Sequence, residues 1–207
     1  MNDGYISVLR SISSKTPTPG GGAVAALTLS HSYSLTSMVA KLTLAREKWI
    51  NGHEISNKLL SICEPGIDES MVMAHNDCDA FDNVMDAYKL SKDSNEEIII
   101  RKEMILKSSL EATNAPYQIA LAAMELFPLL PELAKNGNVN ALTDLASASE
   151  LLYSSIYIAS LNVKINIDSL TEQEGMKFFN EINHILEKSK NFNKEIQNII
   201  FKRLEWH

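Results

Sequence analysis

The apolar residues follow the period of an α-helix along almost the whole chain. Tyr5, Val8, Leu9 and Ile12 stand at positions i, i+3, i+4 and i+7, which predicts a short first helix with one apolar face. No segment alternates apolar and polar residues between hairpin turns, so no strand is expected. The pattern predicts further helices over residues 23–45, 47–63, 68–90, 95–136, 139–163 and from 172 toward the C-terminus.

Prolines and capping residues suggest where these helices begin and end. We expect the third helix to stop before Pro65-Gly66, and we expect Pro116 to kink or divide the helix that ends at Asn136-Gly137. A capping box, S/T-x-x-E, satisfies backbone N–H groups at a helix start. Two such boxes occur, Ser94 with Glu97 and Thr171 with Glu174.

The connections are short, and there is neither an internal repeat nor a linker, which predicts one all-α domain over residues 1–207. Short loops favour antiparallel neighbours, so the expected architecture is an antiparallel helical bundle. Residues 23–40 carry no charge, about the minimum length for a membrane span, but small and polar residues fill the stretch. We therefore expect a buried helix, no membrane association, and a homodimer, because so uncharged a helix should not be left exposed to water.

Composition narrows the class of protein further. The chain has 26 acidic and 19 basic residues, a net charge of −7, and no cluster of Lys and Arg, which argues against nucleic acid as a partner. Cys63 and Cys78 form neither a disulfide framework nor a C-x-x-C half-site, and the N-terminus lacks the features of a secretory signal. These observations predict a cytoplasmic protein without a structural metal site.

One carboxylate stands apart from the others. On the helix predicted over residues 68–90, Asp77 is the only ionisable carboxylate on an otherwise apolar face. The other members of this face are Met73, Ala74, Ala80, Phe81, Val84, Met85 and Tyr88. A buried carboxylate is costly unless it is paired, hydrogen-bonded or protonated. Two interpretations stay open, a functional group or a structural aspartate that caps a helix or pairs with a lysine. Asp144, on the helix 139–163, poses the same choice between a site and a polar seam that fixes helix register.

The loop Gly20-Gly21-Gly22 immediately precedes the uncharged helix. Glycines permit close approach of the backbone to a ligand, and the N–H groups at a helix start favour an anion. The alternative is a tight turn at which two helices cross closely. The loop is not a dinucleotide fingerprint, because a helix precedes it and no strand does.

Several segments, taken in order, resemble the cyclodeaminase/cyclohydrolase family of folate enzymes. The segments are Pro17–Ala26, Met38–Ala40, Leu42-Thr43, Asp77–Met85, Ala87–Lys92, Glu96-Glu97, Arg101, Ala112–Pro116, Gly137-Asn138, Asp144 and Leu161–Asn166. The chain departs from the family pattern at Ala23, where Ser is common, at Ser91, where Pro is common, and at Ile98–Ile100, where charged residues are usual.

The resemblance implies an all-α dimer that binds a tetrahydrofolate derivative near the subunit interface and needs neither a metal nor a redox cofactor. The expected activity is formimidoyltetrahydrofolate cyclodeaminase, and the alternative is methenyltetrahydrofolate cyclohydrolase. A further alternative is a folate-binding or structural helical protein without activity. By the same resemblance Asp77 is the acid/base or electrostatic catalyst. The residues expected to hold the substrate are Gly20, Gly21, Gly22, Lys92, Arg101, Asn138 and Asp144.

Overall fold

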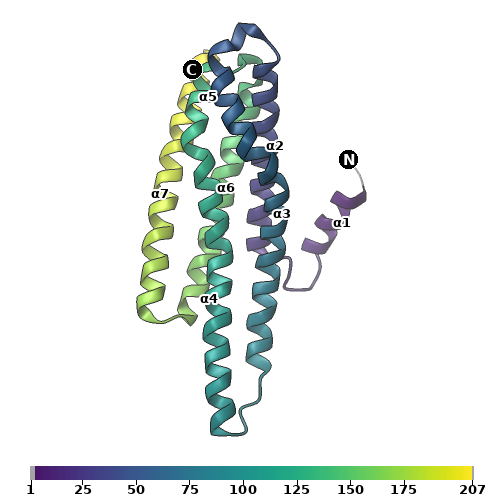
Figure 1. Ribbon diagram of the computed structural model, residues 1–207, viewed down its shortest axis with the longest axis vertical. Coiled ribbons are helices and arrows are strands. Elements are labelled where there is room, and N and C mark those ends of the chain that lie inside the picture. Colours follow the sequence, from purple (N-terminus) through teal and green to yellow (C-terminus); the bar gives the residue numbers. More distant parts are fainter. Residues whose placement is uncertain (1–2, 207) are drawn as a thin grey trace.

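The computed structural model describes residues 3–206, and every regular element among them is helical (Figure 1). Long helices pack side by side with their neighbours antiparallel, as the short loops predict. The α-helices are α1 (Asp3–Ile12), α2 (Gly21–Leu44), α3 (His53–Lys89), α4 (Asn95–Leu126), α5 (Leu130–Asn136), α6 (Leu142–Asn166) and α7 (Glu172–Arg203). The all-α prediction is therefore confirmed for the described residues.

Helices α2 and α6 form the centre of the bundle. Small residues, among them Ala25 and Ala26, let α2 approach its neighbours closely, and it packs against α3, α4 and α6. The polar residues of this uncharged helix are used inside the protein, since Ser32 Oγ donates to the Ala148 carbonyl at 2.8 Å. In the other direction, Ser155 Oγ donates to the Ala25 carbonyl at 2.8 Å. No helix within residues 3–206 is long and apolar enough to cross a membrane.

The prediction that a helix ends before Pro65-Gly66 is wrong. Residues 47–52 form a 3₁₀ turn, and α3 then runs without interruption from His53 to Lys89. Proline and glycine both disfavour a helix interior, but α3 packs along the length of α2. At Gly66 the ring of Tyr33 lies so close that a Cβ atom would stand 2.7 Å from Cε2. The glycine therefore serves helix packing rather than helix termination.

Of the two outcomes predicted for Pro116, a kink or a division of the helix, the division does not occur there. Helix α4 passes through Pro116, which is buried, and ends at Leu126. A 3₁₀ turn at Phe127–Leu129 separates it from α5, where Pro128 and Pro131 follow each other closely. Phe127 anchors this turn by stacking on Phe192 of α7, with ring centroids 6.2 Å apart. Both predicted capping boxes are confirmed.

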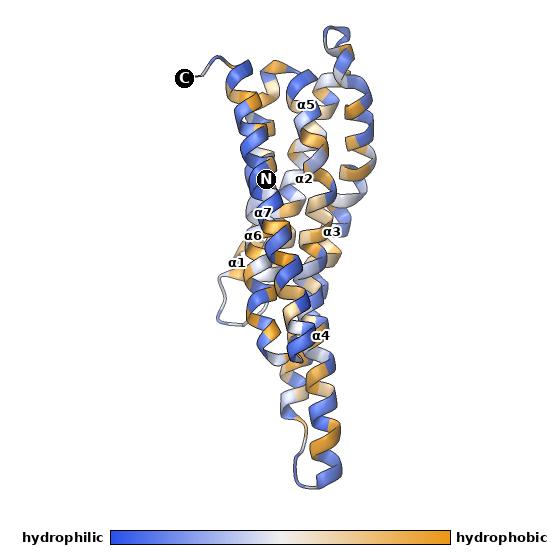
Figure 2. Cartoon of the chain, turned by 90° about the vertical axis from the view of Figure 1, so that its left-hand side faces the viewer, coloured by the Kyte–Doolittle hydropathy of each residue, from blue (hydrophilic) through white to orange (hydrophobic). Residues whose placement is uncertain are grey.

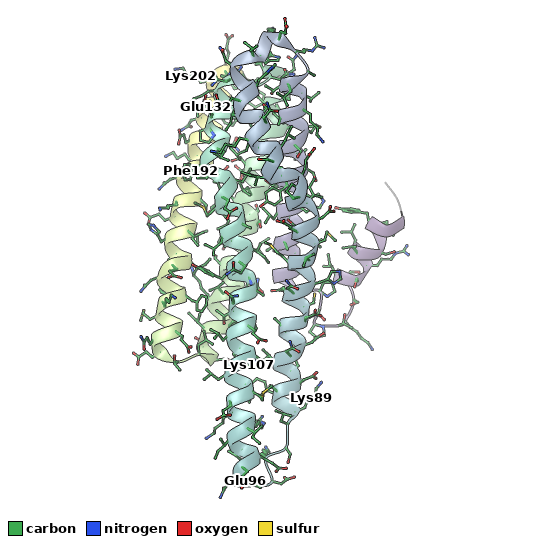
Figure 3. The ribbon with its side chains drawn as sticks, viewed as in Figure 1. Lys89, Glu96, Lys107, Glu132, Phe192 and Lys202 are labelled. Atoms are coloured by element: carbon green, nitrogen blue, oxygen red, sulfur yellow. The ribbon has the colours of Figure 1, made fainter. Side chains whose placement is uncertain are left out.

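Helices α3 and α4 extend beyond the ends of the other long helices as a projecting hairpin, which we call the overhang and define as residues 81–110 (Figures 1 and 3). Apolar residues occur on both helices of the overhang (Figure 2). Phe81, Met85 and Tyr88 are 37%, 43% and 47% exposed. The apolar face predicted around Asp77 is thus covered near Ala74 and Ala80 but uncovered further along α3, because α2 begins only at Gly21.

Candidate functional site

The carboxyl group of Asp77 lies against the backbone of Gly22 at the start of α2. A Cβ atom on Gly22 would overlap the carboxyl group, so only glycine fits there while Asp77 keeps this position. The backbone N–H of Ala23 hydrogen-bonds to the carboxylate. The N-cap residue, Gly20, provides no side-chain cap. Asp77 therefore caps α2 from the neighbouring helix, which places a negative charge at the positive end of the helix dipole.

Burial makes the ionised form of the Asp77 carboxyl group less favourable than it is in water. Burial raises the pKa of Asp77 above its ordinary value, and the hydrogen bond from Ala23 opposes this rise only in part. The two ion pairs among residues 3–206 are Lys41–Glu64 and Lys89–Asp86, and neither involves Asp77. Of the two structural interpretations left open by the sequence, the helix cap is observed and the lysine pair is not.

Gly21 makes a second close approach, to Asn162 of α6. A Cβ atom on Gly21 would lie 3.1 Å from Asn162 Nδ2 and 3.5 Å from Oδ1. Asn162 Nδ2 donates to the Ile158 carbonyl at 2.9 Å, which fixes the orientation of the amide. No described glycine has a positive φ, so the glycine loop serves close helix crossing rather than an unusual backbone conformation.

Asn162 also lies at this junction, although it is not among the residues predicted from the sequence to hold the substrate. Two features of the sequence pointed to this part of the chain. Asn162 belongs to the segment Leu161–Asn166, and it lies on or near the polar seam of Asp144 on the same helix. Neither feature shows which residue Asn162 would meet. That contact depends on how α6 crosses the start of α2, which only the packed bundle determines.

Two predicted substrate-binding residues lie at the tip of the overhang. Arg101 Nη2 donates to the Tyr88 carbonyl at 3.0 Å, and its guanidinium stands over the Tyr88 ring, 5.5 Å from the centroid. Its Nε is buried and has no hydrogen-bond partner in the described part of the chain. Lys92 is exposed in the loop between α3 and α4. Tyr88 follows Asp77 by three turns of α3, about 16 Å along the helix axis.

Asn138 and Asp144 lie at the opposite end of the bundle. The Asn138 backbone N–H donates to Thr43 Oγ1 at 3.0 Å, and Asn138 Nδ2 donates to the Leu42 carbonyl at 3.2 Å. Leu42 and Thr43 are in the last turn of α2, about 30 Å from Gly22 at the rise of an α-helix. Asp144 is in the first turn of α6. Within one chain, neither residue joins the contact between Gly22 and Asp77.

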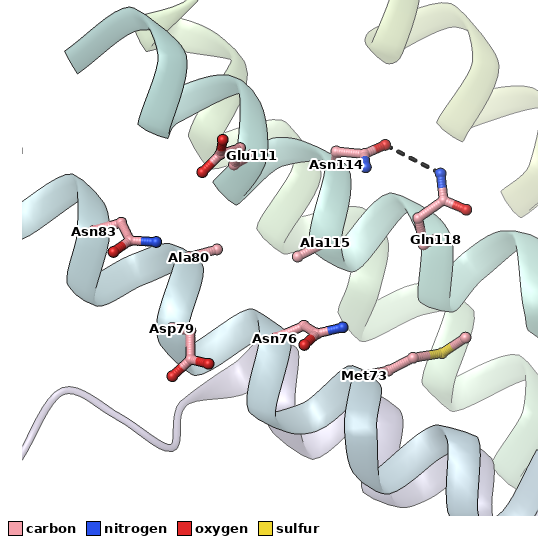
Figure 4. Close-up of a pocket in the computed structure, with 9 residues that line it drawn as sticks. All are labelled: Met73, Asn76, Asp79, Ala80, Asn83, Glu111, Asn114, Ala115 and Gln118. Atoms are coloured by element: carbon pink, nitrogen blue, oxygen red, sulfur yellow. Dashed lines mark hydrogen bonds between the residues drawn. The ribbon is translucent and has the colours of Figure 1, made fainter. Parts of the chain in front are cut away.

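A separate cleft of about 280 Å³ opens between α3 and α4 (Figure 4). Its polar lining comes from both helices, namely Asn76, Asp79, Asn83, Glu111, Asn114 and Gln118. Its two carboxylates and lack of a basic residue make it unsuited to an anionic ligand. No group of three or more His, Cys, Asp or Glu side chains within residues 3–206 is arranged to hold a metal ion.

Comparison with known proteins supports the resemblance read from the sequence. The chain is 31% identical over 173 residues to the methenyltetrahydrofolate cyclohydrolase of Methylorubrum extorquens, which covers 83% of each protein. It is 28% identical over 183 residues to the formimidoyltransferase-cyclodeaminase of Mus musculus, covering 88% of this chain but only 34% of the mouse protein.

A solved structure confirms the fold. The crystal structure of formiminotetrahydrofolate cyclodeaminase from Thermotoga maritima superposes with a TM-score of 0.77 at 23% identity, covering 99% of this chain and 96% of that one. The sequence model of the family described as formiminotransferase-cyclodeaminase matches residues 5–198. This match, which spans nearly the whole chain, shows that the protein belongs to the formiminotransferase-cyclodeaminase family.

Proposed function

We propose that the protein acts on a tetrahydrofolate derivative as a formimidoyltetrahydrofolate cyclodeaminase, with Asp77 as its acid/base or electrostatic catalyst. The observation that carries the proposal is the state of Asp77 itself. Its carboxyl group is half-buried, forms no ion pair with any of residues 3–206, and has a raised pKa. Carboxyl groups in such surroundings are suited to proton transfer near neutral pH.

The cyclodeaminase reaction needs a proton to move between two nitrogens. N10 of 5-formiminotetrahydrofolate attacks the formimino carbon, a tetrahedral carbon forms, and ammonia leaves to give 5,10-methenyltetrahydrofolate. In our proposal the ionised Asp77 accepts the proton from N10, and the protonated carboxyl group then donates it to the departing amine. While ionised, the carboxylate also stabilises the cationic amidine group of the substrate.

The cyclohydrolase reaction is the second candidate, favoured by one specific observation. The chain is 31% identical to the cyclohydrolase of Methylorubrum extorquens, and it is 28% and 27% identical to the formimidoyltransferase-cyclodeaminases of Mus musculus and Gallus gallus, of which it spans about a third. In that reaction water attacks the methenyl carbon of 5,10-methenyltetrahydrofolate, and Asp77 would accept the proton of the water. A folate-binding protein without activity is the remaining candidate.

We also propose that the glycine loop, Lys92 and Arg101 hold the substrate, and that the protein works as a homodimer. The uncovered apolar residues of the overhang support a dimer, because burying them against a second copy removes apolar surface from water. Asn138 and Asp144 would then contribute to a site around Asp77 only if a partner subunit brought them there.

The test is to offer the purified protein both substrates, following ammonia release in one assay and methenyl absorbance in the other. Ammonia release from 5-formiminotetrahydrofolate supports the cyclodeaminase, and loss of the methenyl absorbance above the uncatalysed rate supports the cyclohydrolase. We expect Asp77→Asn to lower turnover by about 10²–10⁴-fold, the usual contribution of a positioned acid/base. Full turnover by a folded Asp77→Asn variant would remove Asp77 from the mechanism. Folate binding without turnover of either substrate would identify a binding protein.

A further inference from the structure

Two functional groups from different helices flank consecutive glycines at the start of α2. The carboxyl group of Asp77, from α3, lies against Gly22, and the amide of Asn162, from α6, lies against Gly21. Consecutive Cα atoms are about 3.8 Å apart. The carboxyl group and the amide therefore border the same turn of backbone, and each fills the side of a glycine where a side chain would otherwise stand.

The amide of Asn162 has one polar atom to spare. Its Nδ2 is bound to the Ile158 carbonyl, which fixes the planar amide and leaves Oδ1 on the arm that faces away from this bond. Among residues 3–206, no protein group donates a hydrogen bond to Oδ1, and the atom is not closed off from solvent. An amide oxygen is an acceptor only, with two lone pairs, so the group that satisfies it must be an N–H or O–H donor.

The backbone of the same turn contributes donors. The first N–H groups of a helix have no acceptor inside the helix. At the start of α2 the N–H of Ala23 is used by Asp77 and that of Val24 by the Gly20 carbonyl. The N–H groups of Gly21 and Gly22 likewise have no acceptor inside the helix, and these two residues lie beside the Asn162 amide and the Asp77 carboxyl group.

We propose that Asn162 binds the substrate directly, with its Oδ1 accepting a hydrogen bond from the N–H of the formimino group while Asp77 faces the same reacting carbon from α3. The inference rests on the proposed cyclodeaminase function. It adds Asn162 of α6 to the site formed by α2 and α3, and it specifies the hydrogen bond that Asn162 forms with the substrate. A neutral acceptor suits this place, because a second carboxylate beside Asp77 would disfavour ionisation of Asp77 through like-charge repulsion.

The decisive experiment compares Asn162→Ala with the wild type on two compounds that differ in one group. The substrate 5-formiminotetrahydrofolate carries an N–H at the reacting carbon, whereas 5-formyltetrahydrofolate carries only a carbonyl oxygen there. We expect Asn162→Ala to lower kcat/KM for the formimino substrate by about 10- to 100-fold, as for the loss of a hydrogen bond to a charged group. Its affinity for 5-formyltetrahydrofolate, measured by calorimetry, should stay unchanged.

A matched variant separates this role from a structural one. Asn191→Ala removes the same side chain from an exposed position of α7, where no hydrogen bond of the Asn191 side chain is present, and we expect it to leave both measurements unchanged. If Asn162→Ala lowers kcat/KM for the formimino substrate and the affinity for 5-formyltetrahydrofolate by the same factor, or lowers neither, the proposed hydrogen bond does not exist. If the wild type releases no ammonia from the formimino substrate, the cyclodeaminase function fails and the assignment of Asn162 falls with it.

Discussion

The carboxyl group of Asp77 occupies the space that a side chain on Gly22 would need. This relationship joins two segments 55 positions apart in the chain, the glycine loop and the middle of α3. It explains the glycine as a requirement for helix–helix approach. The same carboxyl group accepts the hydrogen bond from the Ala23 N–H, while burial keeps its pKa raised.

Replacing Gly22 by Ala should disturb this contact far more than the same change at Gly21. The Cβ of Gly22→Ala would overlap the Asp77 carboxyl group, so Asp77 must move, at a cost of about 1–3 kcal/mol in unfolding free energy typical of overpacking. The Cβ of Gly21→Ala would stand 3.1 Å from Asn162 Nδ2, a contact that a small shift of the amide relieves. Urea unfolding of both variants checks this, and equal stabilities would contradict the geometry.

Replacing Asp77 by Asn should stabilise the folded protein at neutral pH. A carboxyl group whose pKa is raised on folding contributes stability below its ordinary pKa of about 4, and this contribution is lost as the pH rises through the folded-state pKa. The Asn variant has nothing to ionise and keeps a similar shape. Its melting temperature should therefore exceed that of the wild type at pH 7.5, and the difference should shrink toward pH 4. A difference that grows toward acidic pH would show that the carboxylate is stabilised in the folded protein.

Substitution by Ala should lower the stability of the protein at Gly66 but not at Pro65. A Cβ on Gly66 would press on the Tyr33 ring at 2.7 Å, so Gly66→Ala should lower the unfolding free energy by about 1–3 kcal/mol. Pro65 is exposed in the interior of α3, where proline is unfavourable, so Pro65→Ala should not lower stability. Thermal unfolding followed by circular dichroism measures both. A loss of stability in Pro65→Ala would mean that the proline bends α3 into the shape that the bundle requires.

The overhang should mediate self-association. We expect the wild type to have the mass of a dimer in light scattering, and we expect a charge at Ile99, which is 57% exposed, to shift the mass toward the monomer. Ile99→Lys is the test, and Ile50→Lys is its control, at a residue of similar exposure (63%) in the 3₁₀ turn 47–52. A monomeric wild type would contradict the proposed dimer, and dissociation by Ile50→Lys instead would place the interface elsewhere.

Much of this architecture could be predicted from local sequence. The apolar period indicates the helices, and the boxes at Ser94 and Thr171 mark two helix starts correctly, because a capping box involves only residues within one turn. Asp77 also stands out locally, as the lone carboxylate on an apolar face. Each of these features depends on residues that are near one another in the chain.

Where the predictions failed, contacts between distant segments decided the outcome. Pro65 and Pro116 lie inside continuous helices because packing against the bundle outweighs their local cost, whereas the turn at Phe127 is held by Phe192 of another helix. The pairing of Asn162 with Gly21 and of Asp77 with Gly22 is likewise a matter of how α3 and α6 cross the start of α2. The sequence by itself determined the helices and singled out the carboxylate. The tertiary structure decided what that carboxylate touches, since a contact between helices requires the crossing geometry of both.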